Sequence, residues 1–79
     1  MRILFFATLK ERAGSREINL DLPEGTRVDD LKSLLAAGFP LLAEALPTAL
    51  VSVNWNYAFG EDVIPLDAEV AIFPPVSGG

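Results

Sequence analysis

The chain has 79 residues, 51% of them hydrophobic and 22% charged, which suits one compact domain and is too apolar for a disordered segment. It contains no Cys and no His, which excludes disulfides, thiolate or imidazole metal ligands and a cysteine nucleophile. The net charge is -5 and no Lys or Arg follows Lys32, so we expect no binding to nucleic acid or to a membrane and favour a basic protein partner.

The N-terminal sequence does not resemble a secretion signal. Residues 1–6 lack the long apolar core and the small-residue cleavage site of such signals. Charged residues or Pro interrupt every apolar stretch well before the length that spans a bilayer. We therefore expect a cytoplasmic protein.

The first 22 residues predict two antiparallel strands joined by a helical turn. Residues 3–7 alternate, with Ile3 and Phe5 on the core face together with Ala7, and Phe6 on the opposite face. A short helix over 9–13 is predicted by a capping box of Thr8 and Glu11, with Gly14 at its end. Residues 17–22 alternate strictly, which predicts a half-buried second strand.

The middle of the chain predicts one main helix. A turn at 23–25 precedes a helix that starts at Thr26 with Asp29 and ends at Gly38. Its apolar positions form one stripe, made of Val28, Leu31, Leu34 and Leu35. Residues 39–46 predict a second short helical segment that Pro47 ends.

The last third predicts shorter strands. Residues 50–54 alternate, and 63–65 form a short edge piece because Pro cannot donate to a ladder. The final strand, 69–73, places Val70 and Ile72 inward and Ala71 and Phe73 outward. The economical arrangement is an α+β fold, a β-grasp or ubiquitin-like roll, in which a mixed sheet wraps around one main helix. A ferredoxin-like sandwich is the alternative, but it needs a second full-length helix.

The C-terminal segment differs from the rest of the chain. We divide the protein into a β-grasp domain, 1–73, and an extended tail, 74–79. Pro74 and Pro75 stop the last strand and hold the chain extended, and Gly78 and Gly79 carry no side chains. Such a tail can enter a narrow channel and present its terminal carboxylate there.

The whole sequence resembles the sulfur-carrier small subunit of molybdopterin synthase, a ubiquitin-like family. The resemblance lies in five segments: ILFFA at 3–7, RAG at 12–14, VN at 53–54, PLDAEV at 65–70 and FPPVSGG at 73–79. The ending is the most specific of these. The clearest departure is Trp55, where family members often have Gln.

The resemblance implies a role for the terminal glycine. An adenylyltransferase of the ubiquitin-activating type would use ATP to adenylate the Gly79 carboxylate, which then becomes a thiocarboxylate. The tail, comprising Pro74, Pro75, Val76, Ser77 and Gly78 before Gly79, would enter the synthase large subunit. There Gly79 would give sulfur to cyclic pyranopterin monophosphate in molybdenum cofactor biosynthesis. The chain would bind no cofactor or metal itself and would not be an enzyme alone.

Exposed aromatic residues suggest where partners dock. Strand parity places Phe6 and Phe73 opposite the helix, and Tyr57 is expected to join them. Trp55 is interpreted as an edge or core residue. The carboxylates of Glu61, Asp62, Asp67 and Glu69 are interpreted as solvated charges.

Two other functions remain open. One is a related sulfur carrier for thiamine synthesis or transfer-RNA thiolation, which shares the fold and the Gly-Gly ending. The other is a ubiquitin-like interaction module that acts without covalent chemistry. Identification of a pterin-handling large subunit as the partner would separate these functions.

Overall fold

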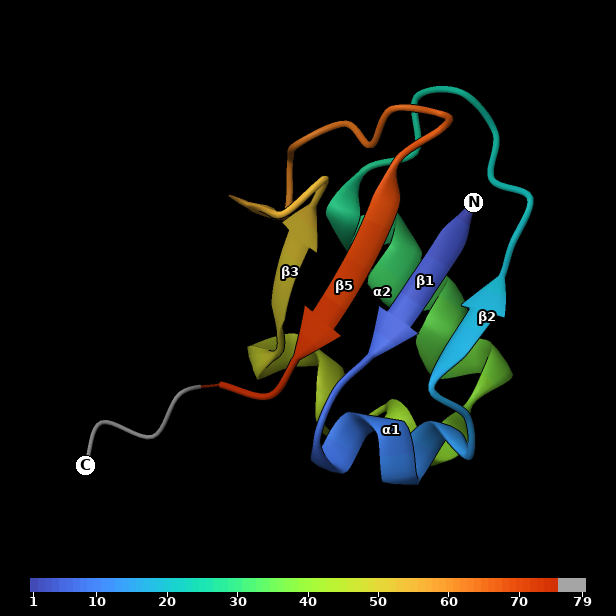
Figure 1. Cartoon of the computed structure of the whole chain (residues 1–79), viewed down its shortest axis with the longest axis vertical. Coiled ribbons are helices and arrows are strands. Elements are labelled where there is room, and N and C mark those ends of the chain that lie inside the picture. Colours follow the sequence, from blue (N-terminus) through green and yellow to red (C-terminus); the bar gives the residue numbers. More distant parts are fainter. Residues whose placement is uncertain (76–79) are drawn as a thin grey trace.

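In the computed structural model, which describes residues 1–75, the chain forms a five-stranded mixed sheet packed on one main helix (Figure 1). The strands, in chain order, are β1 (Arg2–Phe5), β2 (Glu17–Asn19), β3 (Leu50–Val53), β4 (Asn56–Ala58) and β5 (Glu69–Phe73). Their order across the sheet is β2-β1-β5-β3-β4. β1 and β5 run parallel and the other neighbours are antiparallel. The predicted β-grasp roll is confirmed.

The core lies between the sheet and the main helix, α2 (Val28–Gly38), which Figure 1 shows behind the strands. Inward-facing residues of the two central strands, Ile3 and Phe5 from β1 and Val70 and Ile72 from β5, are almost fully buried. From the helix they meet Val28, Leu31 and Leu35. Each fully buried side chain of this kind contributes about 1.5–3 kcal/mol, so this layer is the main source of stability.

One position of the predicted helical stripe is wrong. Leu34 is 50% exposed, whereas Val28, Leu31 and Leu35 are buried. The reason is geometric, because a helix of 3.6 residues per turn directs Leu34 away from the line that the other three follow toward the sheet.

The turn after β1 differs from the prediction. The helix α1 (Thr8–Ala13) begins directly after Ala7, and no side chain within residues 1–75 caps its N-terminus, so the predicted capping box of Thr8 and Glu11 is wrong. Ala7 lies outside the strand with φ 52° and ψ -130°, a conformation that favours Gly. The predicted helix end is confirmed, since Gly14 is left-handed with φ 77° and its N–H donates to the Lys10 carbonyl at 3.1 Å.

The start of α2 also differs from the predicted cap. The Thr26 hydroxyl donates to the Pro23 carbonyl at 2.6 Å and does not cap the helix. Instead, the loop before β5 supplies carbonyls to the first free N–H groups: Val28 N–H donates to the Asp62 carbonyl and Asp29 N–H to the Gly60 carbonyl, both at 3.0 Å. Carbonyl groups of a distant loop therefore accept the hydrogen bonds at the start of the helix, a role predicted for Thr26.

Three shorter elements depart from their predicted forms. The segment after α2 makes two 3-10 turns, η1 (Pro40–Leu42) and η2 (Leu46–Thr48), and Pro47 lies inside the second turn instead of ending the segment. The predicted edge piece at 63–65 is a single bridge between Val63 and Arg27. β2 stops at Asn19, although Leu20 and Leu22 still pack against the core as expected.

Candidate functional site

The face of the sheet opposite α2 carries two groups of side chains. Toward the end of β5, aromatic side chains gather, and we call Phe6, Trp55, Tyr57 and Phe73 the aromatic surface. At the other end, near the start of β1, lies a charged group that we call the ionic cluster, made of Arg2, Glu17 and Glu69. Figure 1 shows that, within the described residues, no helix crosses this face of the sheet.

The rings of the aromatic surface contact one another. Phe6 and Phe73 stack, with ring centroids 4.8 Å apart and an interplanar angle of 12°. Their alignment follows from the sheet, because Phe6 N–H donates to the carbonyl of Ile72, the residue before Phe73, at 3.1 Å. Trp55 meets Phe6 edge to face at a centroid distance of 6.4 Å. The prediction that strand alternation places Phe6 and Phe73 on the same face is confirmed, and the two rings contact each other directly.

Trp55 reaches this surface through the turn between β3 and β4. Asn54 and Trp55 have φ values of 51° and 66°, the pattern of a tight hairpin turn. Trp55 is 60% exposed and directly precedes β4, an edge strand of the sheet, so of the two interpretations of Trp55 the edge position is confirmed and the core position is wrong. The hairpin was not predicted, although Asn54 between two short β-rich runs is the signal that could have revealed it.

Tyr57 joins the surface from β4, where it pairs with Ser52 of β3. The two residues, with Trp55 and Phe73, line a small hollow of 170 Å³ that we call the aromatic slot. Ser52 and Ala71 lie on this side of the sheet but are buried, so Ala71 does not face solvent as its outward parity suggested. The Ser52 hydroxyl has no hydrogen-bond partner within residues 1–75.

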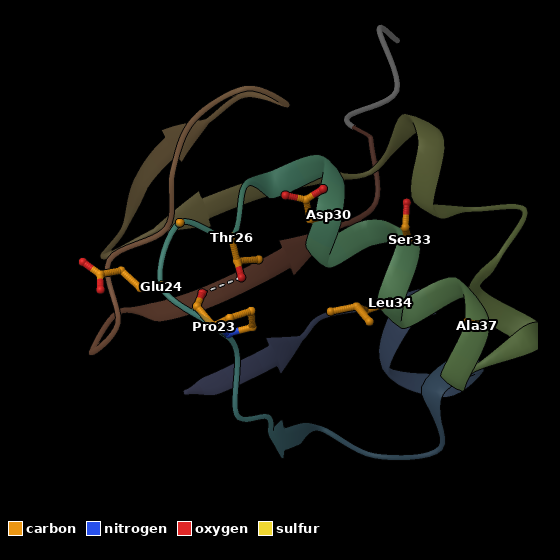
Figure 2. Close-up of a pocket in the computed structure, with 8 residues that line it drawn as sticks. Pro23, Glu24, Thr26, Asp30, Ser33, Leu34 and Ala37 are labelled. Atoms are coloured by element: carbon orange, nitrogen blue, oxygen red, sulfur yellow. Dashed lines mark hydrogen bonds between the residues drawn. The ribbon is translucent and has the colours of Figure 1, made fainter.

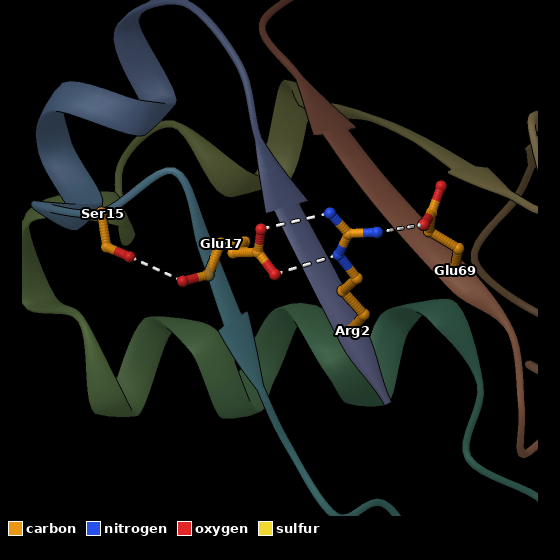
Figure 3. A network of polar contacts seen from close by, with 4 residues as sticks. All are labelled: Arg2, Ser15, Glu17 and Glu69. Carbon is orange, nitrogen blue, oxygen red and sulfur yellow. Dashed lines mark hydrogen bonds and ion pairs between the residues drawn. The ribbon is translucent and has the colours of Figure 1, made fainter.

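The charged groups of the ionic cluster pair with one another (Figure 3). The Arg2 guanidinium donates from Nε to Glu17 at 2.9 Å and from Nη1 to Glu69 at 2.8 Å, which joins β2, β1 and β5. The hydrogen bond from Arg2 lowers the pKa of the Glu17 carboxyl, and Glu17 in turn raises the pKa of Arg2. Of the predicted solvated carboxylates, Glu69 is therefore paired with Arg2.

The tail leaves the sheet beside the aromatic surface. β5 ends at Phe73, which belongs to that surface, and Pro74 and Pro75 follow outside any strand. The residues predicted to act at the end of the tail, namely Val76, Ser77, Gly78 and Gly79, lie outside the described residues. The predicted reactive role of Gly79 therefore stays a prediction.

Another pocket lies on the helix side of the molecule (Figure 2). It measures 490 Å³ and lies between the turn at 23–26 and the exposed flank of α2, with Glu24, Asp30 and Leu34 in its lining. The Thr26 hydroxyl there is already bonded to the Pro23 carbonyl. Among the described residues that line this pocket there is no arginine or lysine of the kind that a phosphate site usually provides.

The described part of the chain, residues 1–75, holds no group of three His, Cys, Asp or Glu residues that could bind a metal ion. Within the same residues no helix is long and apolar enough to cross a membrane. The Asp62 carboxylate, one of the four predicted solvated charges, accepts a hydrogen bond from the Phe59 N–H at 2.7 Å.

Comparisons with known proteins give consistent matches along the whole chain. The model of the ThiS family matches residues 3–79. A molybdopterin synthase sulfur carrier subunit of Chlamydomonas reinhardtii is 35% identical over all of this chain and 98% of its own length. The protein of the same name from Dictyostelium discoideum is 37% identical over 99% of this chain and 94% of its own length. Among solved structures, SAMP1 from Haloferax volcanii superimposes with a TM-score of 0.82 at 30% identity, covering 99% of this chain and 97% of that one.

Proposed function

Because this chain belongs to the ThiS family, we propose that it is the sulfur carrier subunit of a molybdopterin synthase and serves molybdenum cofactor biosynthesis. The observation that carries the proposal is its agreement, from end to end, with curated subunits of that name. The β-grasp fold and the Pro-Pro to Gly-Gly ending support the same function.

The proposed reactive group is the carboxylate of Gly79. A carboxylate is a poor acyl electrophile because it is anionic and would have to expel oxide. Attack of this carboxylate on ATP gives an acyl adenylate and pyrophosphate, and a sulfur nucleophile then expels AMP and leaves a thiocarboxylate. The ATP site belongs to a separate adenylyltransferase in this proposal, since the pocket beside Gly25 and Thr26 has no arginine or lysine among its described lining residues and the Thr26 hydroxyl already donates to the Pro23 carbonyl.

The second half of the reaction belongs to the large subunit. The sequence contains no His and no Cys, so the usual groups for proton transfer near neutral pH are missing from this chain. We assign the pocket for cyclic pyranopterin monophosphate and the proton transfers to the large subunit. The segment from Pro74 to Gly78 then serves as a narrow arm that delivers the Gly79 thiocarboxylate into that pocket.

The aromatic surface is the proposed contact area for both partners. Phe6, Tyr57 and Phe73 lie on the face from which the tail departs, so a partner that covers these rings is well placed to receive the tail. Partly exposed aromatic rings of this kind are enriched at the centres of protein interfaces. Because both partners need the same tail, we expect them to bind one after the other and not together.

A second candidate function is covalent modification of proteins. The structural agreement with a small archaeal modifier protein favours it. The same adenylated glycine would then be captured by a lysine amine, with release of AMP and formation of an amide bond. The two functions differ in product, since one gives a thiocarboxylate on the free chain and the other gives conjugates of higher mass.

The test is intact-mass spectrometry of the purified chain after incubation with an adenylyltransferase of this type, ATP and a sulfur donor. We expect the mass gain of one oxygen replaced by sulfur, located at Gly79 by fragmentation of the tail so that oxidation elsewhere is distinguished. A variant extended by one residue beyond Gly79 is the matched control and should gain nothing. Sulfur gain at wild-type yield in the extended variant would contradict the proposal, as would lysine conjugates without any thiocarboxylate.

A further inference from the structure

One polar atom beneath the aromatic surface has no partner. The Ser52 hydroxyl oxygen is buried and makes no hydrogen bond with any described residue. A buried hydroxyl without a partner is unfavourable in the free protein, and most such groups in native structures are satisfied. The position of this one, in the lining of the aromatic slot, suggests that a binding partner supplies the missing bond.

The slot has the size and walls of a site for one side chain. Its 170 Å³ compares with the engineered cavity of about 150 Å³ that holds benzene. Trp55, Tyr57 and Phe73 provide aromatic rings around it. Because the Ser52 hydroxyl is buried, the rings of Trp55 and Tyr57, which are 60% and 67% exposed, have to turn aside before a ligand can reach it.

Charge selects the kind of side chain. Every charged residue after Lys32 is acidic, so the strands that carry the slot bring no cation to it. Aromatic faces attract cations, and a chain with a net charge of -5 repels a carboxylate. A cation is therefore favoured over an anion as the group that meets Ser52.

The aromatic walls of the slot favour one of the two common cationic groups, the guanidinium of arginine, over the other, the ammonium of lysine. A guanidinium is planar, stacks on aromatic rings, is weakly hydrated and keeps donors free at its edge. An ammonium is compact and strongly hydrated, and it gains less from entering between rings. A guanidinium can stack on these rings and still donate an N–H to the Ser52 oxygen.

We propose that the aromatic slot binds an arginine side chain of the partner protein, whose guanidinium donates a hydrogen bond to the Ser52 hydroxyl. This inference rests on the proposed function, because it specifies how the aromatic surface recognises the large subunit. Ser52 is then a specificity-determining residue, hidden in the free protein and paired only in the complex.

The first test compares Ser52→Ala with wild type in affinity for the large subunit and in thermal stability. We expect affinity to fall about tenfold, the size typical of a hydrogen bond to a charged group, while the melting temperature stays the same or rises. Ser33→Ala, at an exposed position of α2, is the matched control and should change neither quantity. Equal or tighter binding by Ser52→Ala would overturn the proposal in favour of an apolar side chain in the slot. A parallel loss of stability and affinity would overturn it in favour of a structural hydroxyl.

The second test uses a small probe and needs no partner. Titration of the isolated chain with ethylguanidinium should shift the NMR signals of the Trp55 indole and the Ser52 amide, and ethylammonium at the same concentration should shift them less. Equal shifts from the two probes would show that the slot attracts cations in general, which would overturn the proposed preference for arginine. Wild type that fails to bind the large subunit, yet shows the guanidinium-selective shifts, would contradict the proposed function while leaving the slot's preference intact.

Discussion

The two ends of the open sheet face differ in whether their polar groups find partners within the chain. In the ionic cluster, Arg2 lies between Glu17 and Glu69, so each charge finds its partner within the chain. On the aromatic surface, Trp55 and Tyr57 remain largely exposed, and the Ser52 hydroxyl beneath them has no hydrogen-bond partner among residues 1–75. The first end is complete in the free protein, whereas the second has apolar area and a polar atom left for another molecule.

This contrast separates residues that hold the fold from residues that serve binding. Exposed ion pairs contribute little to stability and are screened by salt. The ionic cluster therefore helps to align the strands but adds little to the free energy of unfolding. Aromatic rings left on a surface gain much more when a partner covers them. Variants at the two ends should therefore affect different measurements.

The largest effect is expected from the tail that departs beside the aromatic surface. Deletion of Gly79 should abolish sulfur transfer, because the proposed reactive carboxylate is lost, while the melting temperature stays at the wild-type value. Gly78→Val should act in a similar way, since a branched side chain does not fit a channel shaped for glycine. A truncated chain that still yields molybdopterin in the reconstituted synthase would contradict this role.

The next largest effect is expected at the centre of the aromatic surface. Phe73→Ala should weaken binding to the large subunit by about 2–4 kcal/mol, as for a ring at an interface centre. The free protein should lose only about 1 kcal/mol of stability, because Phe73 is only partly buried and its ring stacks on that of Phe6 at the surface. Phe6→Ala and Tyr57→Ala should show the same direction with smaller losses of affinity.

Paired measurements on each aromatic variant check this expectation: denaturant unfolding of the free chain and calorimetric affinity for the large subunit. If Phe73→Ala cost several kcal/mol of unfolding free energy and left affinity unchanged, the ring would belong to the core. The distinction between the two ends of the face would then fail.

A small effect is expected from the ionic cluster. Glu17→Gln removes the carboxylate that accepts two hydrogen bonds from Arg2, so the free protein should become slightly less stable at neutral pH and low salt. Affinity for the large subunit should not change. A loss of affinity as large as that of Phe73→Ala would show that the interface covers the whole sheet face.

The smallest effect concerns pH. Because Arg2 holds the pKa of Glu17 below its ordinary value of 4.5, the ionised carboxylate stabilises the fold above that pH. The contribution is lost as pH falls through the lowered pKa of the folded state. Denaturant unfolding from neutral pH down to about pH 3 should thus show a steeper loss of stability in wild type than in Glu17→Gln. Identical slopes would contradict the prediction, because they would mean that folding does not change the pKa of Glu17.

The sequence predicted those features that depend on alternation. Ile3 and Phe5, then Val70 and Ile72, alternate with outward residues, and this pattern correctly placed Phe6 and Phe73 on the open face. The fold followed from the order of the elements, because one main helix must cover one face of the sheet.

The features that the sequence did not predict depend on interactions between distant segments. The first turn of α2 is capped by the carbonyls of Gly60 and Asp62, a loop more than thirty residues away, so no local pattern could reveal it. The core position considered for Trp55 was wrong because a large apolar ring usually indicates burial, and only the turn at Asn54 shows that it lies on the surface. The unpaired Ser52 hydroxyl could not be predicted either, because its burial depends on where the rings of Trp55, Tyr57 and Phe73 lie in the fold.

The most direct test of the account is NMR cross-saturation from the large subunit to this chain within their complex, which reports the atoms at the interface. We predict that the strongest signal losses fall on Phe6, Trp55, Tyr57 and Phe73, with little loss at Glu17 or along the exposed flank of α2 around Leu34. Strongest losses around Leu34 and the pocket at the turn of 23–26 would place the interface on the helix side and contradict the account.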